Sequence, residues 1–266
     1  DIAANGYNQL STGPNNTYLV GGGTSAASPG VAGIYAQLSH AYRNLNNDSV
    51  PPSALIKAVM LNTTEDLGNI GPDFRFGWGR VNALRAVQTL EQNRYFTGNI
   101  SQGDSAVHSI TVPGNVKELR VMVYWADKAG AANATRALVN NLDLKLHSPT
   151  NTVSLPWVLN PTPTVAALNS PAVPGIDSLN NVEQVVLTNP QEGAYSIRVH
   201  GTAVPFGPQR YWIVYEWYTE QIVVTYPMGG EGFVPGETEL IRWDASGITG
   251  TFNVQLSTDG GANWTT

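Results

Sequence analysis

The sequence predicts an α/β segment, then an all-β domain, then the start of a second β-sandwich. Apolar residues recur at helical spacing up to about residue 95, alternate with polar residues from about Phe96, and form a further group of short strands after Tyr218. We therefore divide the chain into residues 1–95, residues 96–219 and residues 220–266. We expect the second part to be a jelly roll or other β-sandwich, and the third to begin an immunoglobulin-like or fibronectin-like module.

Apolar spacing and helix-start signals predict three helices in the first segment. They cover residues 24–43, 54–61 and 83–90. Pro29 falls early in the first helix, where we expect its missing N–H to have no intrahelical partner anyway. Before that helix, a polar loop is expected over residues 7–20, with a short strand at 18–20.

Alternating apolar residues separated by turn residues predict six strands in the second segment. They are 109–112, 118–125, 142–146, 182–187, 195–199 and 211–215. The irregular stretch from Thr152 to Leu179 has a length typical of functional or flexible loops. We expect the segment to fold independently, because its length is typical of one domain.

The third segment contains a further group of short strands. They are expected at 222–227, 240–243 and 252–257. Trp243 is the candidate core tryptophan of the immunoglobulin-like module that these strands would begin.

Composition narrows the function classes. Charged residues make up 13% of the chain and its net charge is −6, which argues against nucleic acid or an anionic membrane as a partner. The chain has no cysteine, so disulfide bonds, thiol catalysis and cysteine-based metal sites are excluded. No apolar run reaches the roughly 18 residues of a membrane-spanning helix. The composition fits a secreted bacterial protein.

Ser25 is the strongest candidate for chemistry. It follows three glycines and lies at the start of a predicted helix, where backbone N–H groups and the helix dipole favour a developing negative charge. A nucleophilic serine fits this position, but a serine that merely caps the helix would produce the same pattern. A phosphate-binding loop is disfavoured, because the lysine that it requires is absent.

The longer string favours the nucleophile. Residues 23–33, Gly-Thr-Ser-Ala-Ala-Ser-Pro-Gly-Val-Ala-Gly, resemble the serine signature of subtilisin-like proteases, the subtilases, with Ala26 where most members have methionine. Residues 1–6, Asp-Ile-Ala-Ala-Asn-Gly, and residues 77–83, Gly-Trp-Gly-Arg-Val-Asn-Ala, resemble two further subtilase segments in the expected order. The first segment thus resembles part of a subtilisin-like catalytic domain.

The second segment resembles the β-barrel that follows the catalytic domain in a group of alkaline subtilases. The likeness is carried by residues 139–144, by Asp177 with residues 180–183, and by residues 193–199. Together with the first segment, the resemblance covers about residues 1–218.

This resemblance implies that Ser25 attacks the scissile carbonyl of a polypeptide substrate, and that the aspartate and histidine of the triad lie upstream of residue 1. We expect none of the four histidines, His40, His108, His147 and His200, to be the base, and the N–H of Ser25 to contribute to the oxyanion hole. We therefore expect the C-terminal portion of a secreted serine endopeptidase, inactive without the missing N-terminal part.

An oxygen-rich group in the second segment is the other candidate site. It consists of Asn141, Asp143, Asp177, Asn180, Asn181 and Glu183. Carboxylate and amide oxygens suit Ca²⁺, which accepts irregular geometry, and related barrels bind calcium near such positions. The same residue types also build the turns that flank strands. A structural calcium site and plain turn formation both remain open.

Two function classes remain. One is the enzyme, and the alternative is a non-catalytic pseudoprotease, or an adhesion or sorting module whose β domains bind a surface. The intact serine motif favours the enzyme, because a degenerate protease has little reason to keep its nucleophile.

Overall fold

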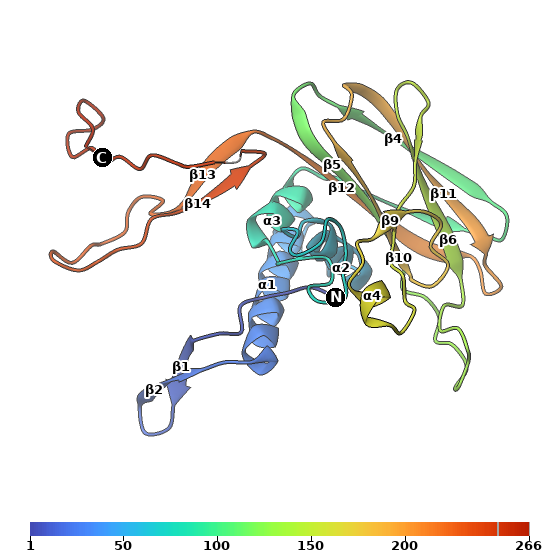
Figure 1. Cartoon of the computed structure of the whole chain (residues 1–266), viewed down its shortest axis with the longest axis horizontal. Coiled ribbons are helices and arrows are strands. Elements are labelled where there is room, and N and C mark those ends of the chain that lie inside the picture. Colours follow the sequence, from blue (N-terminus) through green and yellow to red (C-terminus); the bar gives the residue numbers. More distant parts are fainter. Residues whose placement is uncertain (249, 266) are drawn as a thin grey trace.

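The computed structural model describes residues 1–248 and 250–265, and it places a segment with three helices before a β domain, as the sequence predicts. Figure 1 shows three parts in chain order: a helical segment, a β domain of two layers, and an extended ribbon that leads to the C-terminus. The described chain is therefore mainly β structure attached to a short helical segment.

Three helices form the first segment, and their bounds lie within two residues of those predicted. They are α1 (Thr24–Leu45), α2 (Ser53–Asn62) and α3 (Ala83–Glu91). Before α1, the predicted short strand at 18–20 is present as β2 (Thr17–Gly21), but the predicted loop before it contains a second strand, β1 (Gln9–Gly13), so that the two form a hairpin. Asn15 and Asn16 allow its tight reversal, because both adopt positive φ angles.

Two glycines close the first segment on itself. Gly77 and Gly79 have φ angles of 63° and 114°, which disfavour residues with side chains. A Cβ on Gly77 would lie 2.2 Å from the carbonyl oxygen of Asp1, and one on Gly79 would lie 2.1 Å from that of Glu65. The N–H of Trp78 donates to the same Asp1 oxygen at 2.9 Å. The Gly-Trp-Gly string thus fastens the start of the segment to its end.

The second segment forms two antiparallel sheets of four strands that pack face to face. One has the order β10-β5-β12-β3 and the other β4-β11-β6-β7. The strands are β3 (Tyr95–Ile100), β4 (Ser105–Val112), β5 (Val116–Tyr124), β6 (Asn141–His147), β7 (Val153–Ser154), β10 (Val182–Thr188), β11 (Gly193–Ala203) and β12 (Gln209–Thr219). All six predicted strands are present. The sequence pattern misses β3, where Gly98 and Asn99 have low strand propensity, and β7, whose two residues are too few for an alternating pattern.

The long stretch between β7 and β10 is only partly irregular. Within it, β8 (Trp157–Val158) pairs with β9 (Val173–Pro174), and α4 (Val165–Leu168) is a single helical turn between them. This stretch reaches the helical segment, where Arg75 donates to the side-chain oxygen of Asn169 at 2.7 Å.

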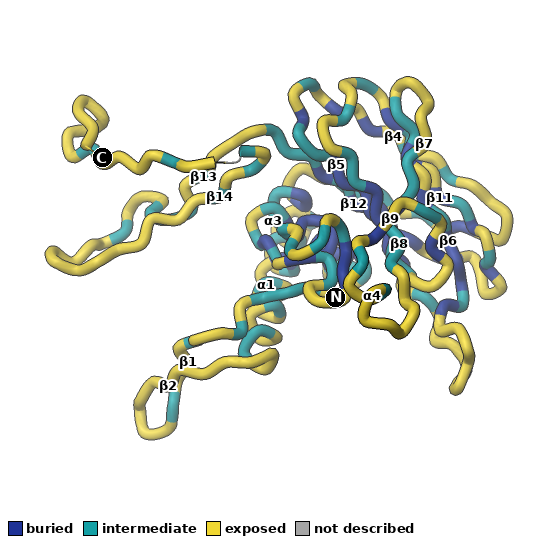
Figure 2. The backbone as a smooth tube through the Cα atoms, viewed as in Figure 1, coloured by how far each residue is buried: buried dark blue, intermediate teal, exposed yellow. Residues whose placement is uncertain are grey.

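Strand β12 joins the β domain to the helices. Tyr211 and Ile213 point into the core between the two sheets, whereas Trp212 and Val214 point to the opposite face of their sheet. The helices cover that outer face, because Val214 and Leu55 of α2 belong to one buried cluster. Figure 2 shows the buried stretch of β12 in dark blue. The β domain therefore shares a core with the first segment. Our expectation of independent folding needs revision, because an isolated β domain would expose this apolar face.

Buried charges reinforce the same junction. Arg85 of α3 forms an ion pair with Glu216 of β12, whose side chain is 6% exposed. Arg120 lies opposite Glu216 on β5 and also donates to the backbone carbonyl of Thr64. Removing one member would leave an uncompensated buried charge, so this network fixes how the helices lie on the sheet.

The third segment is an extended, mostly exposed ribbon of β13 (Gln221–Tyr226) and β14 (Arg242–Ser246). Trp243 packs edge-on against Phe252 with ring centroids 5.8 Å apart, but it remains 36% exposed. At the predicted strand 252–257, the described residues form one bridge, between Leu256 and Thr265. The immunoglobulin-like module stays a prediction.

We expect Leu55→Ala to destabilise the helices and the β domain together. Leu55 is fully buried in the cluster that both share, so the loss of its side chain should lower the free energy of unfolding by about 2–5 kcal/mol. Urea unfolding followed by tryptophan fluorescence and by circular dichroism should give one transition, shifted to lower urea. Val50→Ala, at a position that is 80% exposed, is the control and should change little. Two transitions, of which only one shifts, would contradict the shared core.

Candidate functional site

Ser25 is the second residue of α1, and it is exposed. The residue that precedes the helix is Gly23, with φ 103° and ψ 176°, and no side chain caps this helix end in the described structure. A glycine suits this position, because residues with side chains rarely adopt such a φ angle. Ser25 is therefore not the N-cap, so the alternative of a simple capping serine does not hold.

The turn that leads into α1 is held by a second backbone segment. The N–H of Gly23 donates to the carbonyl of Gly6, and a Cβ on Gly6 would lie 2.5 Å from the Gly23 carbonyl oxygen. Ala26 and Ala27 donate their N–H groups to that oxygen, whereas the earlier N–H groups of a helix have no acceptor within it. The N–H of Ser25 thus lies at the end of α1 that attracts negative charge.

Pro29 lies deeper in α1 than the sequence suggested. It is the sixth helical residue, at the position from which an N–H would normally donate to the Ser25 carbonyl. Proline has no N–H, so that carbonyl loses its usual donor. The expectation that the missing N–H would have had no partner is wrong: Pro29 frees a polar backbone group next to the candidate nucleophile.

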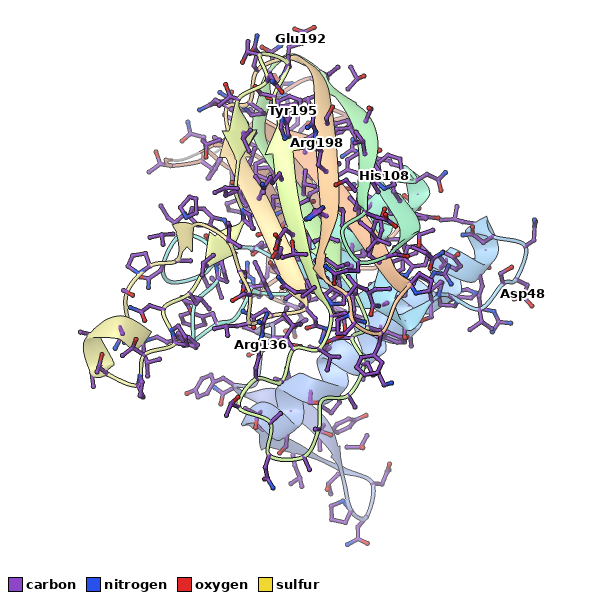
Figure 3. All side chains as sticks on the ribbon, turned by 90° about the vertical axis from the view of Figure 1, so that its right-hand side faces the viewer. Asp48, His108, Arg136, Glu192, Tyr195 and Arg198 are labelled. Atoms are coloured by element: carbon purple, nitrogen blue, oxygen red, sulfur yellow. The ribbon has the colours of Figure 1, made fainter. Side chains whose placement is uncertain are left out.

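None of the histidines in the described chain is close enough to Ser25 to take its proton. His40 lies 15 residues further along α1, which is about 22 Å along the helix axis. His108 bonds to the hydroxyl of Tyr211 at 2.9 Å within the β domain (Figure 3), and burial lowers its pKa. His147 and His200 also bond to neighbours there, the former to Asn151 and the latter to Ser105. The described residues therefore supply a nucleophile without its base.

Two adjoining cavities, of about 570 and about 720 Å³, lie beside the start of α1. Thr24, the residue before Ser25, lines both, together with Lys57 of α2 and Tyr124 of β5. Sequence reasoning missed these residues, because they are far apart in the chain and belong to no common motif. Only their convergence around the cavities marks them as part of the site.

Half of the predicted calcium residues build a turn before β10. The carboxylate of Asp177 accepts the N–H of Leu179 at 2.7 Å and the side-chain amide of Asn180 at 2.7 Å. Asn181 donates its side-chain amide to the carbonyl of Trp125 at 2.7 Å. These contacts are those of an aspartate-stabilised turn, so Asp177, Asn180 and Asn181 have a structural role that requires no ion.

Glu183 occupies an unusual position between the two sheets. It points into the sandwich, as Val185 does two residues later, and it is 1% exposed. Its Oε2 accepts the N–H of Leu144 at 2.6 Å, on an edge of β6 that the short β7 does not reach. Its Oε1 is buried without a partner in the described structure. Burial, together with the nearby charges of Asp143 and Asp177, raises the pKa of Glu183 to about 9, although the hydrogen bond from Leu144 acts in the opposite direction.

Asn141 and Asp143 extend this group on β6. Oδ1 of Asn141 is also buried without a partner in the part of the chain that the structure describes. Its side-chain amide donates to Asp143 at 3.3 Å, and Asp143 accepts the hydroxyl of Thr202. Buried oxygens without hydrogen-bond donors are uncommon in folded proteins, so these atoms are the best candidates for holding a cation.

The six predicted residues therefore do not form one coordination shell. Among the described residues, no group of three or more His, Cys, Asp or Glu side chains is arranged to hold a metal ion. Glu183, Asp143 and Asn141 fit a hard cation only as a smaller set, through their unpartnered and acidic oxygens.

Comparison with known proteins finds similarity to a protein family in the helical segment. The model of the subtilase family matches residues 1–79. An extracellular serine protease of Serratia marcescens is 32% identical over 128 residues, which cover 43% of this chain and 12% of that protein. A PII-type proteinase of Lactococcus lactis subsp. cremoris is 36% identical over 108 residues, 35% of this chain and 6% of that protein.

A third relative matches a longer part of the chain. It is a Dictyostelium discoideum protein described as serine protease/ABC transporter B family protein tagA, 23% identical over 173 residues. The match covers 62% of this chain and 10% of that protein. The chain thus spans only a small fraction of the length of all three relatives.

We expect the stability of the chain in EDTA to fall between about pH 5 and pH 9, and Glu183→Gln to remove most of that fall. The pKa of Glu183 rises from 4.5 to about 9 on folding, so in this window the folded state keeps a proton that the unfolded state has released. Each pH unit then lowers the free energy of unfolding by up to about 1.4 kcal/mol. Urea unfolding across this pH range measures the effect.

The exposed Glu192, at the turn between β10 and β11 (Figure 3), provides the matched control for this substitution. Glu192→Gln should retain the pH dependence of the unchanged chain. If Glu183→Gln retained it as well, the Glu183 carboxyl would titrate normally in the folded protein.

Proposed function

We propose that the chain is part of a secreted serine endopeptidase of the subtilase family with Ser25 as its nucleophile, because the model of that family matches residues 1–79. The position of Ser25 carries the proposal. It lies in the family segment, exposed at the N-terminal end of α1, and it does not cap that helix. The substrate class is polypeptide.

In the proposed mechanism, the hydroxyl oxygen of Ser25 attacks the carbonyl carbon of a peptide bond while its proton passes to a histidine. Negative charge develops on the carbonyl oxygen at the start of α1, where the N–H of Ser25 can donate to it. The histidine then protonates the departing amine, and water hydrolyses the acyl-enzyme.

The histidine must come from outside residues 1–266 in this proposal. His40 is about 22 Å away along α1, and the other three histidines are bonded within the β domain. A serine hydroxyl is a poor nucleophile without such a base. We therefore propose that the aspartate and histidine of the triad belong to another part of the same protease.

We further propose that residues 96–219 are a jelly roll. Eight strands form its two sheets, β10-β5-β12-β3 and β4-β11-β6-β7, and in both sheets strands from early in the domain pair with strands from late in it. Two Greek keys folded on each other have this kind of arrangement. The β13–β14 ribbon supports, as a second proposal, the beginning of an immunoglobulin-like module.

The location that we propose is extracellular, in a bacterium. One bacterial relative is itself described as an extracellular serine protease. In the described part of the chain, every helix is too short or too polar to cross a membrane.

We also propose that the β domain binds a structural Ca²⁺ through a smaller set of residues than the sequence suggested. Glu183, Asp143 and Asn141 would hold the ion, because their oxygens are acidic or lack hydrogen-bond donors. A cation would keep Glu183 ionised at neutral pH and would tie β10 of one sheet to β6 of the other.

In the complete protease, Ser25→Ala should lower kcat/KM for peptide hydrolysis by about three orders of magnitude or more, because only binding and oxyanion effects would remain. Ser28→Ala, also exposed on α1, should have little effect. Residues 1–266 alone should neither hydrolyse peptides nor react rapidly with a fluorophosphonate. Retained turnover in the Ser25 variant would reject the assignment. Absence of turnover in the unchanged complete protein would favour the non-catalytic alternative.

The chain should melt at a higher temperature in millimolar Ca²⁺ than in EDTA, because a ligand that binds only the folded state stabilises it. Asp143→Asn should reduce this difference, whereas Asp104→Asn, at an exposed position outside the proposed site, should preserve it. Differential scanning calorimetry provides the measurement. Coincident melting curves in the two buffers would leave these residues as structural elements of the fold only.

A further inference from the structure

Strand β4 lies at the edge of its sheet, and β11 is the one strand that pairs with it in the described structure. An edge strand carries unpaired N–H and C=O groups along its free side, and these can pair with another chain. Figure 1 shows β4 in the layer farther from α1, α2 and α3, which cover the other sheet. The free edge of β4 is therefore a candidate interaction surface of the β domain itself.

The other outer strands of the two sheets each have a feature that hinders such pairing. Strand β10 is contacted by β8 from the stretch before it. Strand β3 has six residues and includes Gly98 and Asn99, which have low strand propensity. Strand β7 has only two residues, and the carboxylate of Glu183 takes the N–H of Leu144 on the part of β6 that β7 leaves open. Short edges, covered edges and inward-pointing charges are common ways in which proteins prevent pairing at sheet edges.

Strand β4 has none of these protections. Its eight residues, Ser-Ala-Val-His-Ser-Ile-Thr-Val, include no lysine, arginine, acidic residue or proline. It pairs with β11 over residues 105–112 without a bulge, and Val107 on its outward side is 58% exposed. A regular strand of this length and composition is suited to accept a further strand.

Two unpaired cations lie next to this edge. Arg198 of β11 (Figure 3) lies between Val107 of β4 on one side and Lys145 of β6 on the other. Both cationic side chains are exposed, and neither forms an ion pair with another described residue. Like charges at directly opposite positions destabilise a sheet, so a carboxylate brought beside Arg198 would relieve an existing repulsion.

The outward side chains of β4 favour recognition of a backbone over selection of particular side chains. They are small and exposed: Ser105, Val107, Ser109 and Thr111. In strand addition, main-chain hydrogen bonds supply the affinity and the neighbouring side chains supply the specificity. The edge should therefore accept many extended sequences, with Arg198 adding a preference for an acidic residue.

Charge disfavours a second copy of the chain as the added strand. Pairing about a two-fold axis would place the start of one β4 beside the end of the other. Asp104 directly precedes β4 and is exposed. At the other end Glu192 lies beside Gly114, where an added Cβ would be 2.9 Å from its Oε2. Two copies would thus bring Asp104 towards Glu192, and these like charges repel.

We propose that the free edge of β4 binds an extended segment of the polypeptide substrate as an added β-strand, with Arg198 holding an acidic side chain of that segment. The identity of the occupant as substrate rests on the proposed function. Binding at β4 would raise the effective concentration of the same polypeptide at the active site. The β domain would then select extended, acidic polypeptides before cleavage.

Binding can be measured with residues 1–266 and without catalysis. The probe is a short labelled peptide of alternating threonine and valine with one central glutamate, and fluorescence anisotropy reports its binding. Val107→Glu should weaken binding by at least about tenfold, because the new carboxylate occupies Arg198 and repels the peptide. The same pair of opposite charges should preserve the fold. Val153→Glu, the matched change on β7 of the same sheet, should leave binding unchanged.

Arg198→Gln separates charge recognition from backbone pairing. It should weaken binding of the glutamate peptide by about threefold to tenfold and leave binding of a glutamine counterpart unchanged. Hydrogen exchange locates the contact, because the bound peptide should slow exchange within residues 105–112. Unchanged exchange there, or equal binding by the Val107→Glu variant, would overturn the inference.

Measurements without peptide test the other possible occupants of the edge. Light scattering should show a monomer, and a dimer that Val107→Glu dissociates would replace the substrate by a second copy of the chain. Residues 105–112 should exchange equally fast in the complete protease and in the 1–266 chain. Slower exchange in the complete protease would mean that another of its segments already covers β4. Either of these results would overturn the proposal.

Kinetics of the complete protease test the link with the substrate. For a polypeptide with an acidic extended segment, Val107→Glu should raise KM by about threefold to tenfold and leave kcat unchanged. An unchanged KM would overturn the role of β4 in substrate binding. A complete protein that binds the peptide at β4 but does not need Ser25 for turnover would reject the proposed function and leave strand addition at β4 standing.

Discussion

The structure depends on one constraint: both faces of the sheet β10-β5-β12-β3 are apolar, so both must be covered. Successive residues of a strand point to opposite faces, and β12 places Tyr211 and Ile213 on one face and Trp212 and Val214 on the other. The second sheet covers the inner face, and α1, α2 and α3 cover the outer face. The helical segment, in which α1 carries Ser25, is therefore the second covering layer of this sheet.

In this arrangement the β domain packs against the helical segment that contains the candidate nucleophile. Tyr124 illustrates the link, because it belongs to the shared core and also lines both cavities beside Ser25. The ion pair of Arg85 with Glu216 fixes the orientation of α3 on β12, which apolar contact alone would leave less defined. A change in the packing of this sheet would therefore act directly on α2, which contacts both β12 and β5.

Two acidic residues of the β domain, Asp177 and Glu183, have similar chemistry but different roles, because they occupy different positions in the fold. Asp177 accepts hydrogen bonds from its own turn and is satisfied. The alternation of β10 points Glu183 into the sandwich. There its carboxylate accepts the N–H of Leu144, on an edge of β6 that β7 does not reach. Its second oxygen is left without a donor among the described residues. The first residue therefore completes a turn, while the second retains capacity for a ligand.

The sequence by itself determined the features that depend on neighbours in the chain: the three helices, six of the strands, the glycine turn before Ser25 and the resemblance of the serine motif. Periodicity and turn residues report such local preferences directly. It did not predict β1, β3 or the short strands β7, β8 and β9, nor the position of Pro29 inside α1 or the division of the calcium residues. Only the tertiary structure decided those, together with the order of strands and the covering of the β domain by helices. The physical reason is that strand pairing and burial depend on contacts between residues far apart in sequence, which local patterns do not encode.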